Sequence, residues 1–101
     1  MTEIDKLAKA VRDLHMYDTR HLRSEPVTET FNGQVVWDGV VEVFAVSGHS
    51  KAALAYAWSH ETDDGGRRYV AVLGVPPINS AVDAVRAAVV AEIKRGKKGN
   101  A

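Results

Sequence analysis

The sequence predicts an α+β protein: a two-layer sandwich in which an antiparallel sheet of three to four strands carries the N- and C-terminal helices on one face. Apolar residues recur at helical spacing in both terminal segments. Residues 27–75 between them are rich in β-branched and aromatic side chains, and turn sequences divide them into short segments. With 101 residues and a mass of 11.0 kDa, the chain is expected to form one domain over residues 1–101.

A first amphipathic helix is expected over residues 3–18. Its apolar residues follow three- and four-residue steps: Ile4, Leu7, Val11 and Leu14. Thr2 is the expected N-cap, and Asp5 three residues later completes a shortened capping box. Residues 18–26 are polar and without periodicity, so we interpret them as a connector before an extended segment at Pro26.

The central segment predicts consecutive hairpins. A short strand over 27–31 precedes Asn32-Gly33, the dipeptide that best supplies the two positive φ angles of a type I′ turn. Residues 34–46 form the longest β-prone segment, and Gly39 is expected to mark a bulge or bend within it.

Two further strands are expected over 51–60 and 67–75. In the first, Leu54, Tyr56 and Trp58 share one parity and alanines share the other, which favours a strand with one bulky and one small face. The alternative for 51–60 is a short alanine-rich helix that begins near Ser50.

The last helix has the clearest sequence signals. Ser80 is the expected N-cap, and the buried stripe is expected at Val82, Val85, Val89 and Ile93. Gly96 is the expected stop signal, and residues 97–101 are expected to be a frayed tail.

With both helices on one face, the second face of the sheet is left without a cover. That face is expected to carry some of four aromatic residues: Trp37, Phe44, Tyr56 and Trp58. Contiguous exposed apolar surface of this kind usually marks an interface. The first functional hypothesis is therefore a small α+β binding or interaction protein that acts as a homodimer.

The amino-acid composition argues against several classes of protein. Lys plus Arg and Asp plus Glu both number 13, so the formal net charge is zero, which argues against a dedicated duplex-nucleic-acid binder. The chain has no cysteine, which removes disulfides and cysteine-ligated zinc. No signal peptide or membrane-spanning stretch is recognised, so a cytoplasmic protein without a membrane partner is expected.

No catalytic, cofactor or metal motif is recognised, and none of these sites is predicted. The four histidines lack the spacing of helical zinc ligands. A second hypothesis places a small-ligand or enzymatic cleft near the His49 turn, with Tyr56 or Trp58 as a wall and His60 nearby. The tentative interface or ligand-contact residues are thus Trp37, His49, Tyr56 and Trp58.

Nucleic-acid binding through the basic C-terminal segment 94–101 is the third hypothesis. The order helix, three strands, helix is also that of the double-stranded RNA-binding domain, in which a basic cluster opens the second helix. Here residues 79–83 open that helix without a basic residue before Arg86, so we treat the shared order as coincidental.

The segment Val36-Trp37-Asp38-Gly39-Val40-Val41-Glu42-Val43-Phe44, followed by Gly48-His49 and Tyr56-Ala57-Trp58, resembles a group of small bacterial proteins. Some of these are the hypothetical products of mobile gene cassettes in integrons. The resemblance covers the central part of the chain. It implies an accessory bacterial protein and supplies no catalytic residues.

Overall fold

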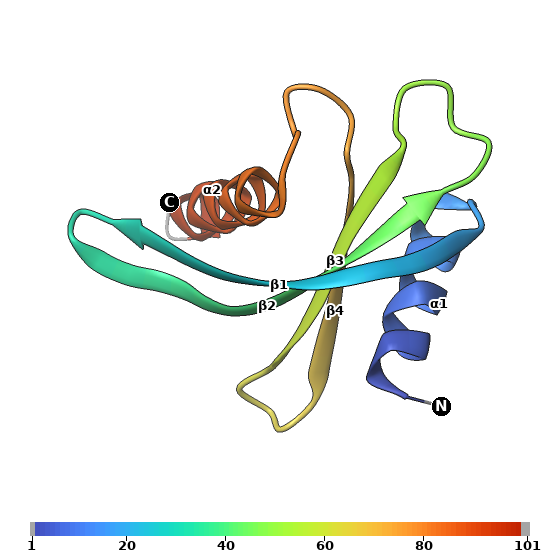
Figure 1. Cartoon of the computed structure of the whole chain (residues 1–101). Helices are drawn as coiled ribbons and strands as arrows, with labels where there is room; N and C mark the ends of the chain where they lie inside the picture. Colours follow the sequence, from blue (N-terminus) through green and yellow to red (C-terminus); the bar gives the residue numbers. More distant parts are fainter. Residues whose placement is uncertain (1, 100–101) are drawn as a thin grey trace.

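The computed structural model describes the backbone of residues 2–99 and the side chains of residues 2–91. Its elements are α1 (Glu3–His15), β1 (Thr19–Phe31), β2 (Gln34–Val46), β3 (Leu54–Glu61), β4 (Arg67–Leu73) and α2 (Ala81–Gly99). The strands form one antiparallel sheet in the order β1-β2-β3-β4 (Figure 1). The predicted α+β class and antiparallel sheet are confirmed.

The two helices lie on opposite faces of this sheet, so their predicted placement on one face is wrong. Ala55 and Ala57 of β3 belong to the cluster that packs against α1, whereas Tyr56 and Trp58 belong to the cluster that packs against α2. Successive side chains of a strand point to opposite faces, so each helix covers a different face. The small alanines let α1 approach closely, and the bulky residues fill the space beneath α2.

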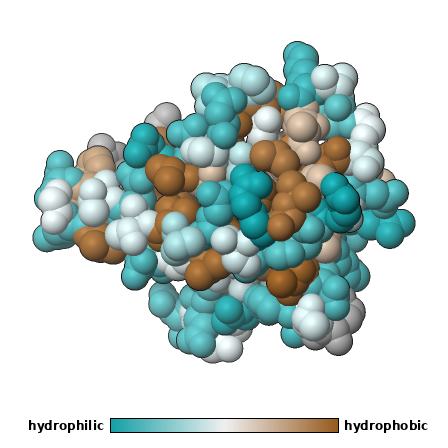
Figure 2. Space-filling model, viewed as in Figure 1, coloured by the Kyte–Doolittle hydropathy of each residue, from teal (hydrophilic) through white to brown (hydrophobic). Residues whose placement is uncertain are grey.

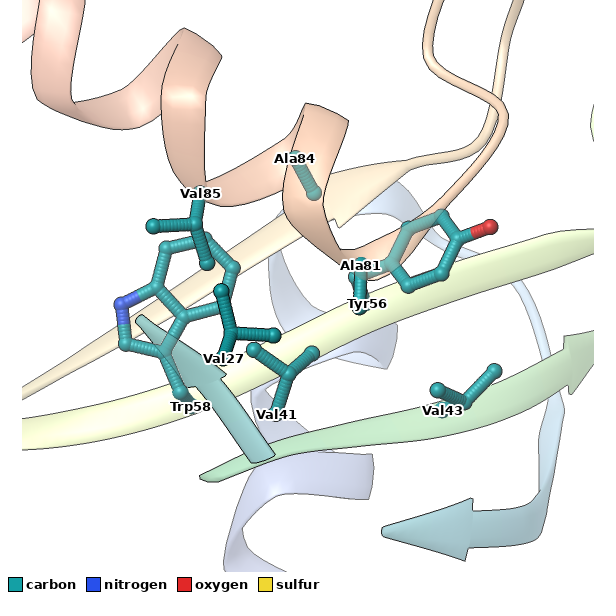
Figure 3. Packing of buried hydrophobic residues seen from close by; sticks show 8 residues of the cluster. All are labelled: Val27, Val41, Val43, Tyr56, Trp58, Ala81, Ala84 and Val85. Carbon is teal, nitrogen blue, oxygen red and sulfur yellow. The ribbon is translucent and has the colours of Figure 1, made fainter. Parts of the chain in front are cut away.

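The α2 side holds the larger core (Figure 3). Its buried members come from four elements: Val27, Val41, Val43, Tyr56, Trp58, Ala81, Ala84 and Val85. The α1 side is buried mainly through Leu7 and Val11, which pack with Phe44 of β2. Because each face has its own cover, the physical basis for the predicted homodimer through an uncovered sheet face is removed.

α1 begins as the sequence predicts and ends earlier. Thr2 and Asp5 form a reciprocal capping box in which each backbone N–H donates to the other side chain, at 3.1 Å in both directions. The helix ends at His15, because Met16 adopts a left-handed conformation with φ of 66°. Leu14 is therefore 61% exposed and is not part of the predicted buried stripe.

The predicted connector over 18–26 is wrong, because β1 already begins at Thr19. It pairs with β2 along its length, and as an edge strand it exposes many side chains, which explains its polar composition. Pro26 fits this position because edge strands tolerate a residue without an N–H.

The Asn32-Gly33 turn has the predicted pair of positive φ angles, 53° and 78°. Gly39 does not mark a bulge: it pairs regularly with Val27. The register shifts instead at Leu22 of β1 and Val36 of β2, each an extra residue between paired neighbours.

The remaining elements follow their predictions with three differences. Residues 51–60 contribute a strand, β3, as predicted. In α2, Ser80 caps the helix by accepting from the Asp83 backbone N–H at 3.1 Å, but Val82 is exposed and alanines take its place in the buried stripe. The backbone stays helical through Gly96 to Gly99, and β4 ends at Leu73. The Ile93 side chain and the end of the predicted tail lie outside the described residues.

Within residues 2–99, neither helix combines the length and apolarity that a membrane crossing requires.

Candidate ligand-binding groove

A groove opens on the α2 side of the sheet, between α2 and strands β2, β3 and β4. Its volume is about 810 Å³. Its lining is mainly apolar: Val36, Trp37, Asp38, Trp58, His60, Arg68, Val70, Val72, Val85, Ala88, Val89 and Ala91. Small-molecule pockets typically measure about 300 to 1,000 Å³ and combine apolar walls with a few polar groups. Within the described part of the chain, this groove is the strongest candidate for a functional site.

The groove exists because the β1–β2 hairpin forms a curved arm beside α2 (Figure 1). An ion pair joins the arm to the helix: Arg86 Nε and Nη2 donate to Glu29 Oε1 and Oε2 at 3.2 and 3.4 Å. Glu29 pairs with Trp37 across the hairpin. The ion pair is therefore placed to hold α2 beside the strand that carries the groove's tryptophan wall.

Two tryptophans meet in this groove. The rings of Trp37 and Trp58 lie edge to face, with centroids 5.6 Å apart and planes at 70°. Trp58 is only 2% exposed and belongs to the core, whereas Trp37 is half-buried. A Cβ on Gly39 would lie 3.1 Å from Trp37 Cη2, so the indole occupies the space that the glycine leaves open. Trp37 thus supplies the accessible aromatic surface.

The polar end of the groove is formed where β3 and β4 pair beyond Trp58. His60 pairs directly with Arg68, two residues along from the Trp58 and Val70 pair on the same face. His60 Nδ1 lies 3.2 Å from the backbone oxygen of Glu61. A carbonyl only accepts, so Nδ1 carries the hydrogen, and Nε2 of the neutral ring is an acceptor. Arg68 is engaged in an interaction of its own.

Asp38 also lines the groove, and one of its carboxylate oxygens has a partner outside it. Asp38 Oδ1 accepts from Thr28 Oγ1 at 2.9 Å across the hairpin. A carboxylate can accept further hydrogen bonds through its second oxygen, so His60 and Asp38 are both acceptors for a ligand, and His60 is the one two residues from Trp58 on β3.

The structure places the four residues singled out from the sequence in different parts of the protein. Trp37 and Trp58 line the groove. Tyr56 is 2% exposed in the core beside Trp58, and burial, followed by the charge of Glu25, raises the pKa of its phenol. It supports the groove without lining it.

His49 lies in the β2–β3 loop and does not line the groove. Its Nδ1 accepts from the backbone N–H groups of Lys51 and Ala52, each at 2.9 Å. Its ring packs against Tyr17 with centroids 5.0 Å apart. Through these contacts, His49 fixes the conformation of the β2–β3 loop. Neither the groove beside α2 nor the smaller one lined by Lys6, Lys9, Ala10, Asp13 and Tyr69 includes His49, so the cleft near His49 stays a prediction.

A second polar cluster lies on the opposite sheet face, where Glu42 Oε1 accepts from Ser24 and lies 2.9 Å from His21 Nε2. In a serine nucleophile triad, the imidazole stands between the serine and the acid. Here the carboxylate stands between the other two groups, so the imidazole is not placed to activate the hydroxyl. Residues 2–91 also bring together no group of three acidic or histidine side chains that could hold a metal ion.

Sequence reasoning placed His60 near Trp58 but did not foresee that Arg68 and the valines of β4 share a site with the tryptophans. The available signal was parity: Trp58 and His60 are two residues apart on β3, and Val70 and Arg68 are two apart on β4. Parity places each pair on one face, but the register between strands was needed to bring the pairs together.

Comparisons of the chain with protein-family models, curated proteins and solved structures found no match. The likeness to integron cassette products therefore stays a prediction.

Proposed function

We propose that the protein binds a small, mainly apolar molecule in the groove between α2 and the sheet. The observation that carries this proposal is the half-exposed Trp37 at the wall of a groove of about 810 Å³. Large aromatic and aliphatic side chains that converge around a concave space, with polar groups at one end, are typical of ligand sites. Burying a ligand there would remove apolar surface from water at about 25 cal/mol per Å².

The arrangement favours binding over catalysis. His60 is the groove residue whose chemistry suits proton transfer, but it is exposed and its Nδ1 is bonded to a backbone carbonyl. The carbonyl can orient the imidazole, but a general base also works on a nucleophile or a substrate proton, and the described residues that line the groove include no hydroxyl or thiol side chain. The other polar lining residues, Asp38 and Arg68, have interactions of their own.

Two alanines on α2 allow a matched test. Ala88 lines the groove, and its neighbour Ala87 is exposed and does not. Ala88→Trp would fill the space with an indole, whereas Ala87→Trp places the same side chain in solvent at the same helix propensity. Circular dichroism and thermal unfolding establish that both variants fold.

The experiment is native mass spectrometry of the three proteins after incubation with a small-molecule extract of the expression host. We expect extra mass, released on denaturation, on the wild type and Ala87→Trp and little on Ala88→Trp. Equal extra mass on folded Ala88→Trp would place the ligand elsewhere. No extra mass on any of the three would contradict binding of a host metabolite.

Self-association is a second proposal, carried by a separate observation. Apolar side chains on the hairpin arm are exposed: Phe31 by 54%, Val35 by 62% and Val40 by 51%. On the face shown in Figure 2, however, brown residues along the arm alternate with teal ones. Stable interfaces need a contiguous complementary surface of roughly 800 Å² per partner. The arm therefore supports this proposal less strongly than the groove supports ligand binding.

The same mass spectra test self-association, because a dimer would appear at twice 11.0 kDa. If a dimer is present, Val35→Glu with Val40→Glu should convert it to the monomer by placing charges in the contact. A dimer that survives both changes would exclude this arm as the interface.

A further inference from the structure

We infer that the groove selects a flat ring system that carries a hydrogen-bond donor, with the ring against Trp37 and the donor at His60. The inference rests on the proposed function and names the class of ligand for that site.

The preference for a flat ring follows from how the Trp37 indole is held. Its indole lies over Gly39 and contacts Trp58 edge to face, so neighbours on two sides restrict its position. The part of the indole that remains exposed stands at the wall of the groove. Aromatic pairs in stacked or edge-to-face geometry gain stabilisation beyond their buried area. A flat ring therefore gains more from this wall than a puckered ring of similar size.

The preference for a hydrogen-bond donor follows from the hydrogen bonding of His60. Its Nδ1 hydrogen is committed to the Glu61 carbonyl, which leaves Nε2 as an acceptor in the neutral ring. A ligand O–H or N–H can donate to this nitrogen, whereas an ether oxygen at the same position cannot. Because His60 is exposed, water can replace a missing donor. The preference for a donor is thus modest, about 3- to 10-fold for one hydrogen bond.

The spacing along β3 from Trp58, whose ring contacts Trp37, to His60 gives the scale of the ligand. His60 lies two residues along β3 from Trp58 on the same face, a distance of about 7 Å at the usual rise per residue. Two fused six-membered rings with one substituent span a comparable length. The valines of β4 and α2 along this path present only hydrocarbon.

Three probes of nearly equal size separate these features. 2-Naphthol has flat rings and a donor, 2-methoxynaphthalene has flat rings without a donor, and decahydro-2-naphthol has a donor without flat rings. Isothermal titration calorimetry would measure their affinities for the wild type and for the His60→Leu and Trp37→Leu variants. Glu61→Leu is the control, because the exposed Glu61 side chain is outside the groove and the substitution keeps the backbone carbonyl that accepts from His60 Nδ1.

We expect 2-naphthol to bind the wild type about 3- to 10-fold more tightly than each of the other probes. His60→Leu should remove its advantage over 2-methoxynaphthalene, and Trp37→Leu its advantage over decahydro-2-naphthol. Glu61→Leu should keep both. Preferences that are absent, or that survive the two groove substitutions, would overturn the inference.

The result also separates this inference from the proposed function. Equal binding of all three probes, blocked by Ala88→Trp, would reject the ring-and-donor class and leave the groove as a ligand site. If none of the probes binds but native mass spectrometry shows extra mass that Ala88→Trp abolishes, the class is again wrong and the site stands. Absence of both signals would reject the inference and the proposed function together.

Discussion

Trp37 stands edge to face against Trp58, with the ring centroids 5.6 Å apart, and its indole fills the space above Gly39. One tryptophan is thereby part of the core, and the other forms the wall of a groove. A glycine two residues away in the chain sets how close that wall lies to the strand.

Substitution of Gly39 tests this relationship. In Gly39→Ala, the new Cβ would lie 3.1 Å from Trp37 Cη2, so the half-exposed indole must move. We expect an altered near-ultraviolet circular dichroism spectrum of the tryptophan pair, and a stability loss of about 1 kcal/mol, at the low end for overpacking because the ring can shift. Val40→Ala, at the next position of the same strand, is the control. An unchanged spectrum in Gly39→Ala would contradict the placement of the indole.

Because only one side of α1 is buried against the sheet, leucine-to-alanine substitutions at two positions of this helix should change the free energy of unfolding by very different amounts. Leu7 is 2% exposed and Leu14 is 61% exposed on the same helix. Leu7→Ala should lower the free energy of unfolding by about 2 to 5 kcal/mol, because it leaves a cavity between α1 and the sheet. Leu14→Ala should change it by no more than about 0.5 kcal/mol. Urea denaturation measures both, and similar losses would show that α1 does not pack as described.

The ion pair between Glu29 and Arg86 predicts measurable coupling between the arm and α2. The side chain of Glu29 is 13% exposed and that of Arg86 is 59% exposed, so screening by water is partial. A double-mutant cycle with Glu29→Gln and Arg86→Met should give a coupling of about 0.5 to 1 kcal/mol that falls as salt is added.

The pair formed by Lys9 and Asp13 on α1 is the comparison for this cycle. Both of its side chains are more than half exposed, and exposed pairs four residues apart on a helix contribute about 0.3 to 0.5 kcal/mol. A Glu29–Arg86 coupling below that of this reference pair would mean that the ion pair does not tie the helix to the arm.

The capping box of α1 predicts a defined pH dependence. The backbone N–H of Thr2, followed by its side chain, lowers the pKa of Asp5 below its ordinary value of 3.8. A carboxyl with a lowered pKa in the folded state contributes stability above its ordinary pKa, and that contribution is lost as pH falls through the lower value. Thermal unfolding should therefore show a smaller acid-induced loss in Asp5→Asn than in the wild type. An equal loss in the two proteins would exclude this contribution.

Local sequence signals predicted the elements that depend on neighbouring residues. Residues 34–46 form β2 as predicted, and Asn32-Gly33 adopts the predicted positive φ angles. Both features depend on short-range chemistry, namely β-propensity and the backbone freedom of a turn dipeptide.

Features that depend on distant partners could not be predicted in the same way. The polar residues of 19–26 become a strand because β2 offers them a partner, a contact that composition does not reveal. The alternation of Ala55 with Tyr56 predicts two different faces, but nothing in it assigns α1 to one and α2 to the other.

In the candidate site, too, features that depend on neighbouring residues could be predicted from the sequence, and features that depend on distant partners could not. Trp37 and Trp58 are recognisable as aromatic candidates from the sequence, whereas the contribution of Arg68 and Val70 depends on the register between β3 and β4. His49 drew attention as a turn histidine, but its ring nitrogen binds its own loop. Short-range hydrogen bonds to the backbone compete with a ligand for the same atom.

The most direct test of the groove is an NMR titration of methyl-labelled protein with 2-naphthol and then with decahydro-2-naphthol. The account predicts shifts at methyl groups that line the groove on β4 and α2, namely those of Val70, Val72, Val85 and Val89. It predicts little change at Val11 and Val46, which pack on the α1 side of the sheet. Shifts confined to the α1 side, or absent from the groove valines with both probes, would contradict it.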